Sequence, residues 1–125
     1  MGRRILVIDD EQIILELLVT ILSEKGCEVD TARNGTEGLE MAYSREYDII
    51  ISDIDMPVMK GIEFYRKLIE KMPSMKQRIL FMTGGKNRET DTFLKETGGR
   101  CLLKPFQVTD LLKAVNEIAA FEPNP

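Results

Sequence analysis

Apolar residues along the chain form two kinds of pattern that alternate from one end to the other. In one kind, several apolar residues follow each other without a break, which is typical of a strand buried on both faces. In the other, apolar residues recur every three or four positions, as on the buried side of a helix. The unbroken runs, with the short segment 27–32, predict strands at 4–8, 27–32, 49–52, 79–82 and 101–103.

A segment with helical spacing follows each predicted strand. The helices are expected at 12–25, 36–45, 62–72, 88–97 and from 108 to about 119. Gly26 and Pro73 are placed to end the first and third helices, and Thr36 is a candidate N-cap of the second. The fourth helix has only Phe93 and Leu94 as strongly apolar residues, so we expect it to be the most mobile element. The residues expected on the buried helix faces are Ile13, Ile14, Leu17, Leu18, Ile21, Leu22, Leu39, Ala42, Phe64, Leu68, Ile69, Val108, Leu111, Leu112, Val115 and Ala119.

Five repeats of strand and helix predict a parallel sheet in which right-handed crossovers place helices on both faces. We expect an α/β fold, the flavodoxin-like (βα)5 sandwich with strand order 2-1-3-4-5, in which the first and third strands lie side by side at the centre. The length of 125 residues fits a single domain, 1–125, with an ordered core at about 3–121 and a frayed tail at 122–125.

Composition narrows the classes of function. The formal net charge of −4 argues against direct binding of nucleic acid, whose phosphates require a basic face. No apolar run approaches the ~20 residues that span a bilayer, and the N-terminus lacks the long apolar segment of a signal peptide. We therefore expect a protein of the cytoplasm that does not bind to a membrane. The chain has no histidine, which excludes a histidine phosphodonor within it. Its cysteines, Cys27 and Cys101, belong to opposite edges of the predicted sheet, too far apart for a disulfide.

Polar residues follow four of the predicted strands, at the edge of the sheet where parallel α/β folds bind ligands. They are Asp9 and Asp10, Asp53, Thr83 and Lys104. Crowded carboxylates repel each other and require a cation, and hard oxygen ligands with room for water suit Mg²⁺. An aspartate that attacks phosphorus needs a metal, a cation and a hydroxyl to neutralise the phosphoryl oxygens. The set therefore favours phosphoryl transfer, with Lys104 and Thr83 as the cation and the hydroxyl.

The sequence resembles the receiver domain of two-component response regulators over essentially its whole length. The resemblance rests on Ile8-Asp9-Asp10-Glu11, Asp53-x-x-Met56-Pro57-x-Met59-x-Gly61, Thr83-Gly84 and Lys104-Pro105-Phe106, which have the family's order and spacing. It implies a phosphorelay domain that accepts a phosphoryl group from a histidine kinase or a histidine phosphotransfer domain and switches conformation to regulate an output. Such a domain is not an enzyme beyond its own phosphorylation and autodephosphorylation. The segments 81–85 and 96–100 also look like the receivers of hybrid sensor kinases, so a covalently attached kinase or output domain is a further expected partner.

The same resemblance implies a role for each acidic residue of the site. Asp53 would be the phosphoacceptor. Asp10 and Asp53 would bind Mg²⁺ directly, the backbone carbonyl of Asp55 would complete the protein ligands, and Asp9 would act largely through a water. The side chain of Asp55 has two open interpretations: a solvated loop acid, or a group that steers water at the phosphoryl group and so tunes hydrolysis.

The resemblance also assigns the residues that would face the phosphoryl group. Lys104 would pair with one of its oxygens, ahead of a cis bond to Pro105; Thr83 would donate a hydrogen bond to it, and Gly84 would leave space for it. One position departs from the family. Cys101 stands three residues before the lysine, where a Tyr or Phe that moves with the threonine is common, and a thiol cannot sweep the same volume. An ordinary strand thiol and a redox role both remain open for it.

A rival interpretation is a haloacid-dehalogenase-type phosphatase, because Asp53-Ile-Asp55 echoes the nucleophile and the acid of that family. Two features count against it. Pro57 stands where that family usually has Thr or Val, and the motif follows the third predicted strand where those enzymes have it after the first. A receiver that binds a partner without being phosphorylated is a third possibility, which the complete set of site residues disfavours.

Overall fold

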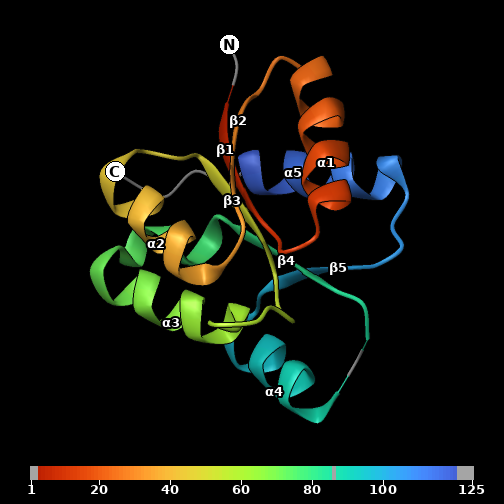
Figure 1. Cartoon of the computed structure of the whole chain (residues 1–125). Helices are drawn as coiled ribbons and strands as arrows, with labels where there is room; N and C mark the ends of the chain where they lie inside the picture. Colours follow the sequence, from red (N-terminus) through yellow and green to blue (C-terminus); the bar gives the residue numbers. More distant parts are fainter. Residues whose placement is uncertain (1–2, 86, 121–125) are drawn as a thin grey trace.

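The computed structural model describes residues 3–85 and 87–120. Strands and helices alternate in the predicted order (Figure 1). The strands are β1 (Arg4–Ile8), β2 (Glu28–Ala32), β3 (Ile49–Asp53), β4 (Ile79–Thr83) and β5 (Arg100–Leu103). The helices are α1 (Gln12–Glu24), α2 (Gly35–Ser44), α3 (Gly61–Lys71), the short 3₁₀ helix η1 (Pro73–Gln77), α4 (Arg88–Thr97) and α5 (Val108–Ala119). All strand pairs are parallel and the order is β2-β1-β3-β4-β5, which confirms the predicted topology.

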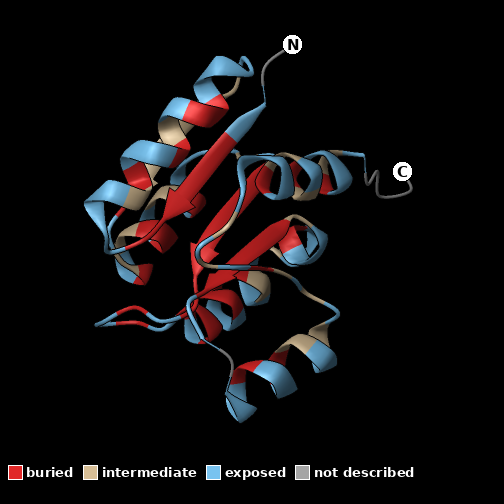
Figure 2. Ribbon diagram, turned by 90° about the vertical axis from the view of Figure 1, so that its right-hand side faces the viewer, coloured by how far each residue is buried: buried red, intermediate tan, exposed pale blue. Residues whose placement is uncertain are grey.

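The sheet lies between two layers of helices. α1 and α5 cover one face, and α2, α3 and α4 cover the other (Figure 1). Successive residues of a strand point to opposite faces, so Ile5 and Val7 pack toward α1 and α5 while Leu6 and Ile8 pack toward α2 and α3. Every residue of β3 and β4 is buried, as the continuous apolar runs require, whereas the helices expose their outer sides (Figure 2).

Strand register places the polar strand ends at one edge of the sheet. Ile8 of β1 lies opposite Ser52 of β3, and Thr83 of β4 lies opposite Leu103 of β5. These strands therefore end almost level with each other, and the polar residues at or after their ends lie beside the same crevice. The crevice lies at the carboxyl ends of β1, β3, β4 and β5, as predicted.

The buried face of α1 is rotated from the predicted one. Ile13 and Leu17, expected inside, are 79% and 44% exposed, whereas Leu15, which the prediction passed over, is 2% exposed. Ile13 and Leu17 each stand two residues from Leu15, about 200° around the helix. The segment has apolar residues on more than one side, so periodicity alone did not decide which side the sheet covers. Contact with β1, β3 and α5 selects the stripe through Leu15, Leu18 and Leu22.

The N-cap of α2 was also predicted wrongly. The helix begins at Gly35, so Thr36 already lies inside it, and the cap is Asn34, whose side-chain oxygen accepts a hydrogen bond from the Glu37 N–H at 2.8 Å. An extended residue with a short polar side chain at that place satisfies a free N–H of the first turn.

The remaining differences from the predicted elements are small. β1 has the predicted bounds, and each other strand differs from its prediction by one residue at one end. Ile118 is buried in α5 while Val108 is 48% exposed, and Tyr65 joins the buried residues of α3. The predicted tail, 122–125, lies outside the described residues.

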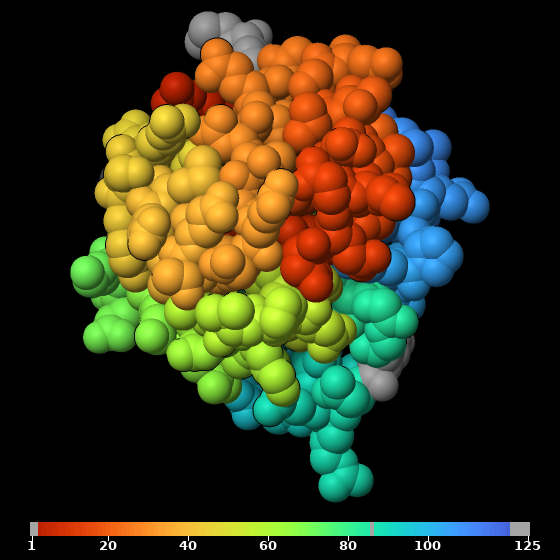
Figure 3. Space-filling view, in the orientation of Figure 1, coloured from red at the N-terminus to blue at the C-terminus, as the bar shows by residue number. Residues whose placement is uncertain are grey.

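Helix α4 is held by few buried side chains. Only Thr90 and Phe93 of its residues are buried. The Phe93 ring meets the rings of Tyr65 and Phe81 edge to face, with both centroid distances at 5.2 Å. In the space-filling view α4, in teal, projects from the lower edge of the molecule (Figure 3). The mobility of α4 stays a prediction, and Phe93 is its one large side chain that is fully buried in the core.

Candidate functional site

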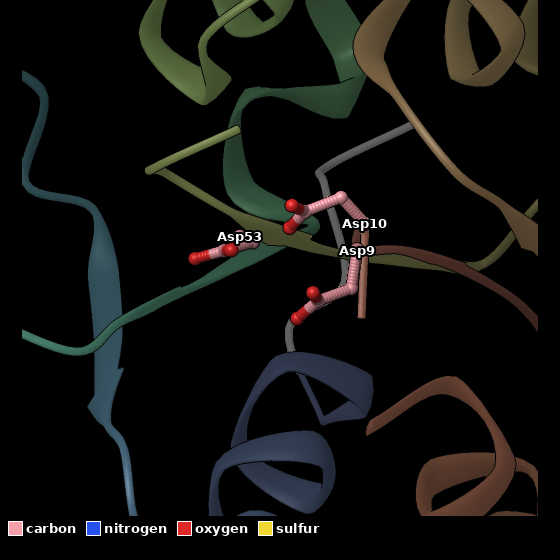
Figure 4. Close-up of side chains that lie close together, drawn as sticks. All are labelled: Asp9, Asp10 and Asp53. Atoms are coloured by element: carbon pink, nitrogen blue, oxygen red, sulfur yellow. The ribbon is translucent and has the colours of Figure 1, made fainter. Parts of the chain in front are cut away.

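Three aspartates meet at the centre of the crevice. Asp9 and Asp10 follow β1 and Asp53 ends β3, and one carboxylate oxygen of each lies within 4.8 Å of the others (Figure 4). Asp9 and Asp53 are 0% and 3% exposed, while Asp10 is open to solvent. Two buried carboxylates and one accessible carboxylate leave the cluster reachable from one side.

Lys104 supplies the positive charge of the cluster. Its Nζ lies 2.7 Å from Asp9 Oδ2, 3.3 Å from Asp53 Oδ2 and 3.4 Å from Glu11 Oε1. The backbone N–H of Lys104 donates to the Thr83 carbonyl at 2.8 Å, which fixes the start of the chain segment after β5. The peptide bond from Lys104 to Pro105 is cis, as expected. The sequence placed Lys104 here but gave no role to Glu11, whose proximity depends on how the lysine side chain is directed.

The electrostatics of the cluster reflect burial and an excess of negative charge. Burial raises the pKa of Asp53 to about 6, and the charge of Asp9 adds to this while Lys104 opposes it. Burial also raises the pKa of Asp9, against the hydrogen bond from Lys104. Burial lowers the pKa of Lys104, but Asp9 and Asp53 outweigh it and the net direction is upward. One ammonium group thus faces several carboxylates, and a hard divalent cation would relieve the remaining repulsion.

Thr83 ends β4 and is 1% exposed. Its hydroxyl lies 2.7 Å from the Gly85 carbonyl oxygen and 3.0 Å from Asp55 Oδ2. The backbone N–H of Asp55 in turn points to Asp53 Oδ1 at 3.4 Å. The contact between the side chains of Asp55 and Thr83 was not foreseen, because no sequence signal joins residues 28 positions apart.

The β3–α3 loop is held close to the end of β3. Its Met56 and Met59 are buried under the loop. Gly61 donates its N–H to the Ile54 carbonyl at 2.9 Å, and a Cβ on Gly61 would stand 2.5 Å from the Asp53 carbonyl oxygen. No atom would lie within 4 Å of a Cβ on Gly84, which agrees with the open space expected there. Only glycine fits at position 61, so this residue sets how the loop returns beneath the site.

The two cysteines occupy the places that the topology predicted. Cys27 precedes β2 and Cys101 lies on β5, the two edge strands. Cys101 is half-buried, packs against the core beneath α2, α3 and α4, and pairs with Phe81 in the sheet register. A hollow of about 240 Å³ lies beside it, lined by Thr83, Thr90, Asp91, Leu94, Cys101 and Leu103. The space next to Thr83 is thus bounded by a thiol in place of an aromatic ring.

The family model described as the response regulator receiver domain matches residues 5–116. The chain belongs to this family. The match takes in all the strands except the first residue of β1, and most of the last helix, so the receiver resemblance of the sequence is confirmed. It identifies a signalling domain, not a classical enzyme, and the phosphatase alternative is not favoured.

The relatives of this receiver domain agree with that assignment. The response regulator ArlR of Staphylococcus aureus (strain Mu50 / ATCC 700699) is 30% identical over 96% of this chain and 54% of its own length. The chain thus spans about half the length of the curated relatives that it matches. The chemotaxis protein CheY4 of Vibrio cholerae is 33% identical with a TM-score of 0.85, over 94% of this chain and 99% of that one. The response regulator TrrA of Thermotoga maritima, solved in complex with Mg²⁺-BeF, is 35% identical with a TM-score of 0.81, over 93% of this chain and 98% of that one.

Among the described residues, no helix has the length and apolar character that spanning a bilayer requires.

Proposed function

We propose that Asp53 is the phosphoacceptor of this receiver domain and that a histidine kinase or a histidine phosphotransfer domain supplies the phosphoryl group. The observation that carries the proposal is the difference in hydrogen bonding between the two buried aspartates. Asp9 accepts from the Glu11 N–H at 2.9 Å and from Lys104 at 2.7 Å, so both of its oxygens are engaged. Among the described residues, the Asp53 oxygens have longer contacts, Oδ2 with Lys104 Nζ at 3.3 Å and Oδ1 with the Asp55 N–H at 3.4 Å. Asp53 is thus held less tightly than Asp9 and is the carboxylate more able to form a new bond.

The transfer step needs an ionised nucleophile and a neutralised phosphoryl group. With its pKa at about 6, Asp53 is ionised at neutral pH. One of its oxygens attacks phosphorus, the O–P bond forms as the P–N bond of the phosphohistidine breaks, and the electron pair of that bond stays on the imidazole nitrogen. Lys104 forms an ion pair with one phosphoryl oxygen, and the Thr83 hydroxyl donates a hydrogen bond to another. Hydrolysis of the aspartyl phosphate returns the domain to its starting state.

The donor set fits Mg²⁺. Asp10 and Asp53 would bind it directly with the backbone carbonyl of Asp55, and the bound ion would neutralise charge on the phosphoryl oxygens. Asp9 would act through a water, because its own oxygens are engaged by Lys104 and by the Glu11 N–H. The complex of the relative TrrA with Mg²⁺-BeF supports this assignment.

We infer that residues 1–125 make up one receiver domain that regulates a protein output in the cytoplasm. The greater length of the curated relatives supports an attached output domain as a partner. A similar receiver domain, solved from a signal transduction histidine kinase of Syntrophus aciditrophicus, supports an attached kinase, as in a hybrid sensor kinase. A net charge of −4 supports protein partners and no direct contact with nucleic acid. Phosphorylation would shift the populations of two conformations, and Thr83 would carry the change toward α4.

The test is phosphorylation by acetyl phosphate in the presence of Mg²⁺, followed by intact-mass analysis. The wild-type chain should gain one phosphoryl group, as should Asp110→Asn, which removes an exposed carboxylate on α5. Asp53→Asn should gain none, and chelation of Mg²⁺ should prevent the gain in every variant. No gain in the wild type, an equal gain in Asp53→Asn, or sustained release of phosphate from a phosphomonoester would refute the proposal.

A further inference from the structure

The side chain of Asp55 contacts Thr83, a contact for which the proposed phosphoryl transfer has no use. Asp55 stands between two groups that the phosphoryl group must engage. Its N–H points to Asp53 Oδ1 at 3.4 Å, and its carboxylate oxygen lies 3.0 Å from the Thr83 hydroxyl. Asp55 is exposed while Thr83 is 1% exposed, so the contact reaches from the loop surface to a buried hydroxyl. The loop therefore contacts the strand end through a charged group.

The hydroxyl of Thr83 has one proton and more than one acceptor within reach. The Gly85 carbonyl oxygen lies 2.7 Å from the hydroxyl oxygen and Asp55 Oδ2 lies 3.0 Å from it. The Gly85 N–H donates to the same hydroxyl oxygen at 3.3 Å. A carboxylate is a stronger acceptor than a neutral carbonyl. The hydroxyl can donate a hydrogen bond to a phosphoryl oxygen on Asp53 only when it no longer donates to Gly85 or Asp55.

We propose that the Asp55 carboxylate holds Thr83 in its unphosphorylated arrangement and competes with the phosphoryl group for the threonine hydroxyl. Asp55 is then a positioning residue that acts through Thr83, and it sets how far phosphorylation shifts the domain. The inference rests on the proposed function for the identity of the competing group. It differs from the two interpretations given above, since Asp55 acts here on a hydroxyl proton, not on an attacking water.

The competition predicts that removal of the Asp55 charge strengthens binding of a phosphoryl mimic. At saturating Mg²⁺, Asp55→Asn should bind beryllofluoride about three- to tenfold more tightly than wild type, since a charge-assisted hydrogen bond is replaced by a weaker neutral one. Isothermal titration gives the affinity, and the affinity for Mg²⁺ alone is measured for each variant so that saturation is assured.

The effect must pass through Thr83, and a double-mutant cycle tests this. In the Thr83→Val background Asp55→Asn should change the affinity for beryllofluoride by less than about twofold. Asp91→Asn is the matched control: Asp91 lines the hollow beside Thr83 but makes no hydrogen bond to its hydroxyl among the described contacts. Its affinity should stay within about twofold of wild type. An equal gain from Asp55→Asn in both backgrounds, or no gain in either, would overturn the inference.

A second measurement needs no ligand and is independent of the phosphoacceptor assignment. Three-bond couplings of the Thr83 side chain, measured by NMR on the free protein, report how firmly its rotamer is fixed. Wild type and Asp91→Asn should show one rotamer, and Asp55→Ala should show averaging between rotamers. An unchanged rotamer in Asp55→Ala would refute the hold on Thr83, whereas wild-type protein that fails to bind beryllofluoride would refute only the proposed function.

Discussion

Replacement of Asp53 by asparagine is expected to stabilise the fold at neutral and alkaline pH while it abolishes phosphorylation. Asp53 is 3% exposed and close to Asp9, and burial followed by this like charge outweighs the attraction of Lys104. The ionised form of Asp53 therefore costs folding free energy. Asparagine has nearly the same shape but no charge, and its carbonyl oxygen keeps one of the two accepting positions while its NH2 group can only donate. The variant therefore removes the cost of the charge without opening a cavity.

The magnitude follows from the shift in pKa. Folding raises the pKa of Asp53 from 3.8 to about 6. Each pKa unit corresponds to about 1.4 kcal/mol, which gives about 3 kcal/mol as the upper limit of the gain above pH 7. A folded-state pKa above the unfolded one means that the folded protein binds the extra proton, so the contribution is fully favourable below about pH 4 and is lost as the pH rises through 6. We expect a gain of about 1–3 kcal/mol at pH 8 and close to zero at pH 4.

Urea denaturation at the two pH values measures this difference. The chain has no tryptophan, so far-UV circular dichroism is the signal, and divalent cations are removed with chelator. Glu40→Gln removes an exposed carboxylate on α2 and serves as the control, with little change at either pH. A destabilised Asp53→Asn at pH 8, or a gain that is the same at both pH values, would refute the argument that an ionised Asp53 opposes folding.

Three other predictions test the metal, the loop and α4. Saturating Mg²⁺ should raise the free energy of unfolding of wild type by about 1–3 kcal/mol in thermal or urea melts, and much less in Asp10→Asn; equal effects in both would count against the shared crevice. Val58 is 83% exposed and has a φ of 71°, which is strained for a β-branched residue, so Val58→Gly should stabilise the protein by about 1 kcal/mol in urea melts, and a loss would contradict this. Phe93→Ala should destabilise by about 3 kcal/mol and speed amide exchange across α4 more than in α1, whereas uniform exchange would show that α4 is not held separately.

The local periodicity of the sequence determined most of the fold. Continuous apolar runs marked the strands because parallel strands are covered on both faces, and strands alternating with helices leave few possible topologies. The ends of these strands also predicted that Asp9, Asp53 and Lys104 share one crevice. This worked because the carboxyl ends of parallel strands lie on one side of the sheet by construction.

Tertiary structure alone decided the features that depend on direction and register. The exposed side of α1, where Ile13 lies, was set by contact with the sheet and α5, since apolar residues occur on more than one side of that helix. The engagement of both Asp9 oxygens depends on the path of the Lys104 side chain. The contact of Asp55 with Thr83 depends on the course of the β3–α3 loop next to β4. Periodicity reports which residues are buried, but the partner of each polar atom is set by three-dimensional geometry that joins distant segments of the chain.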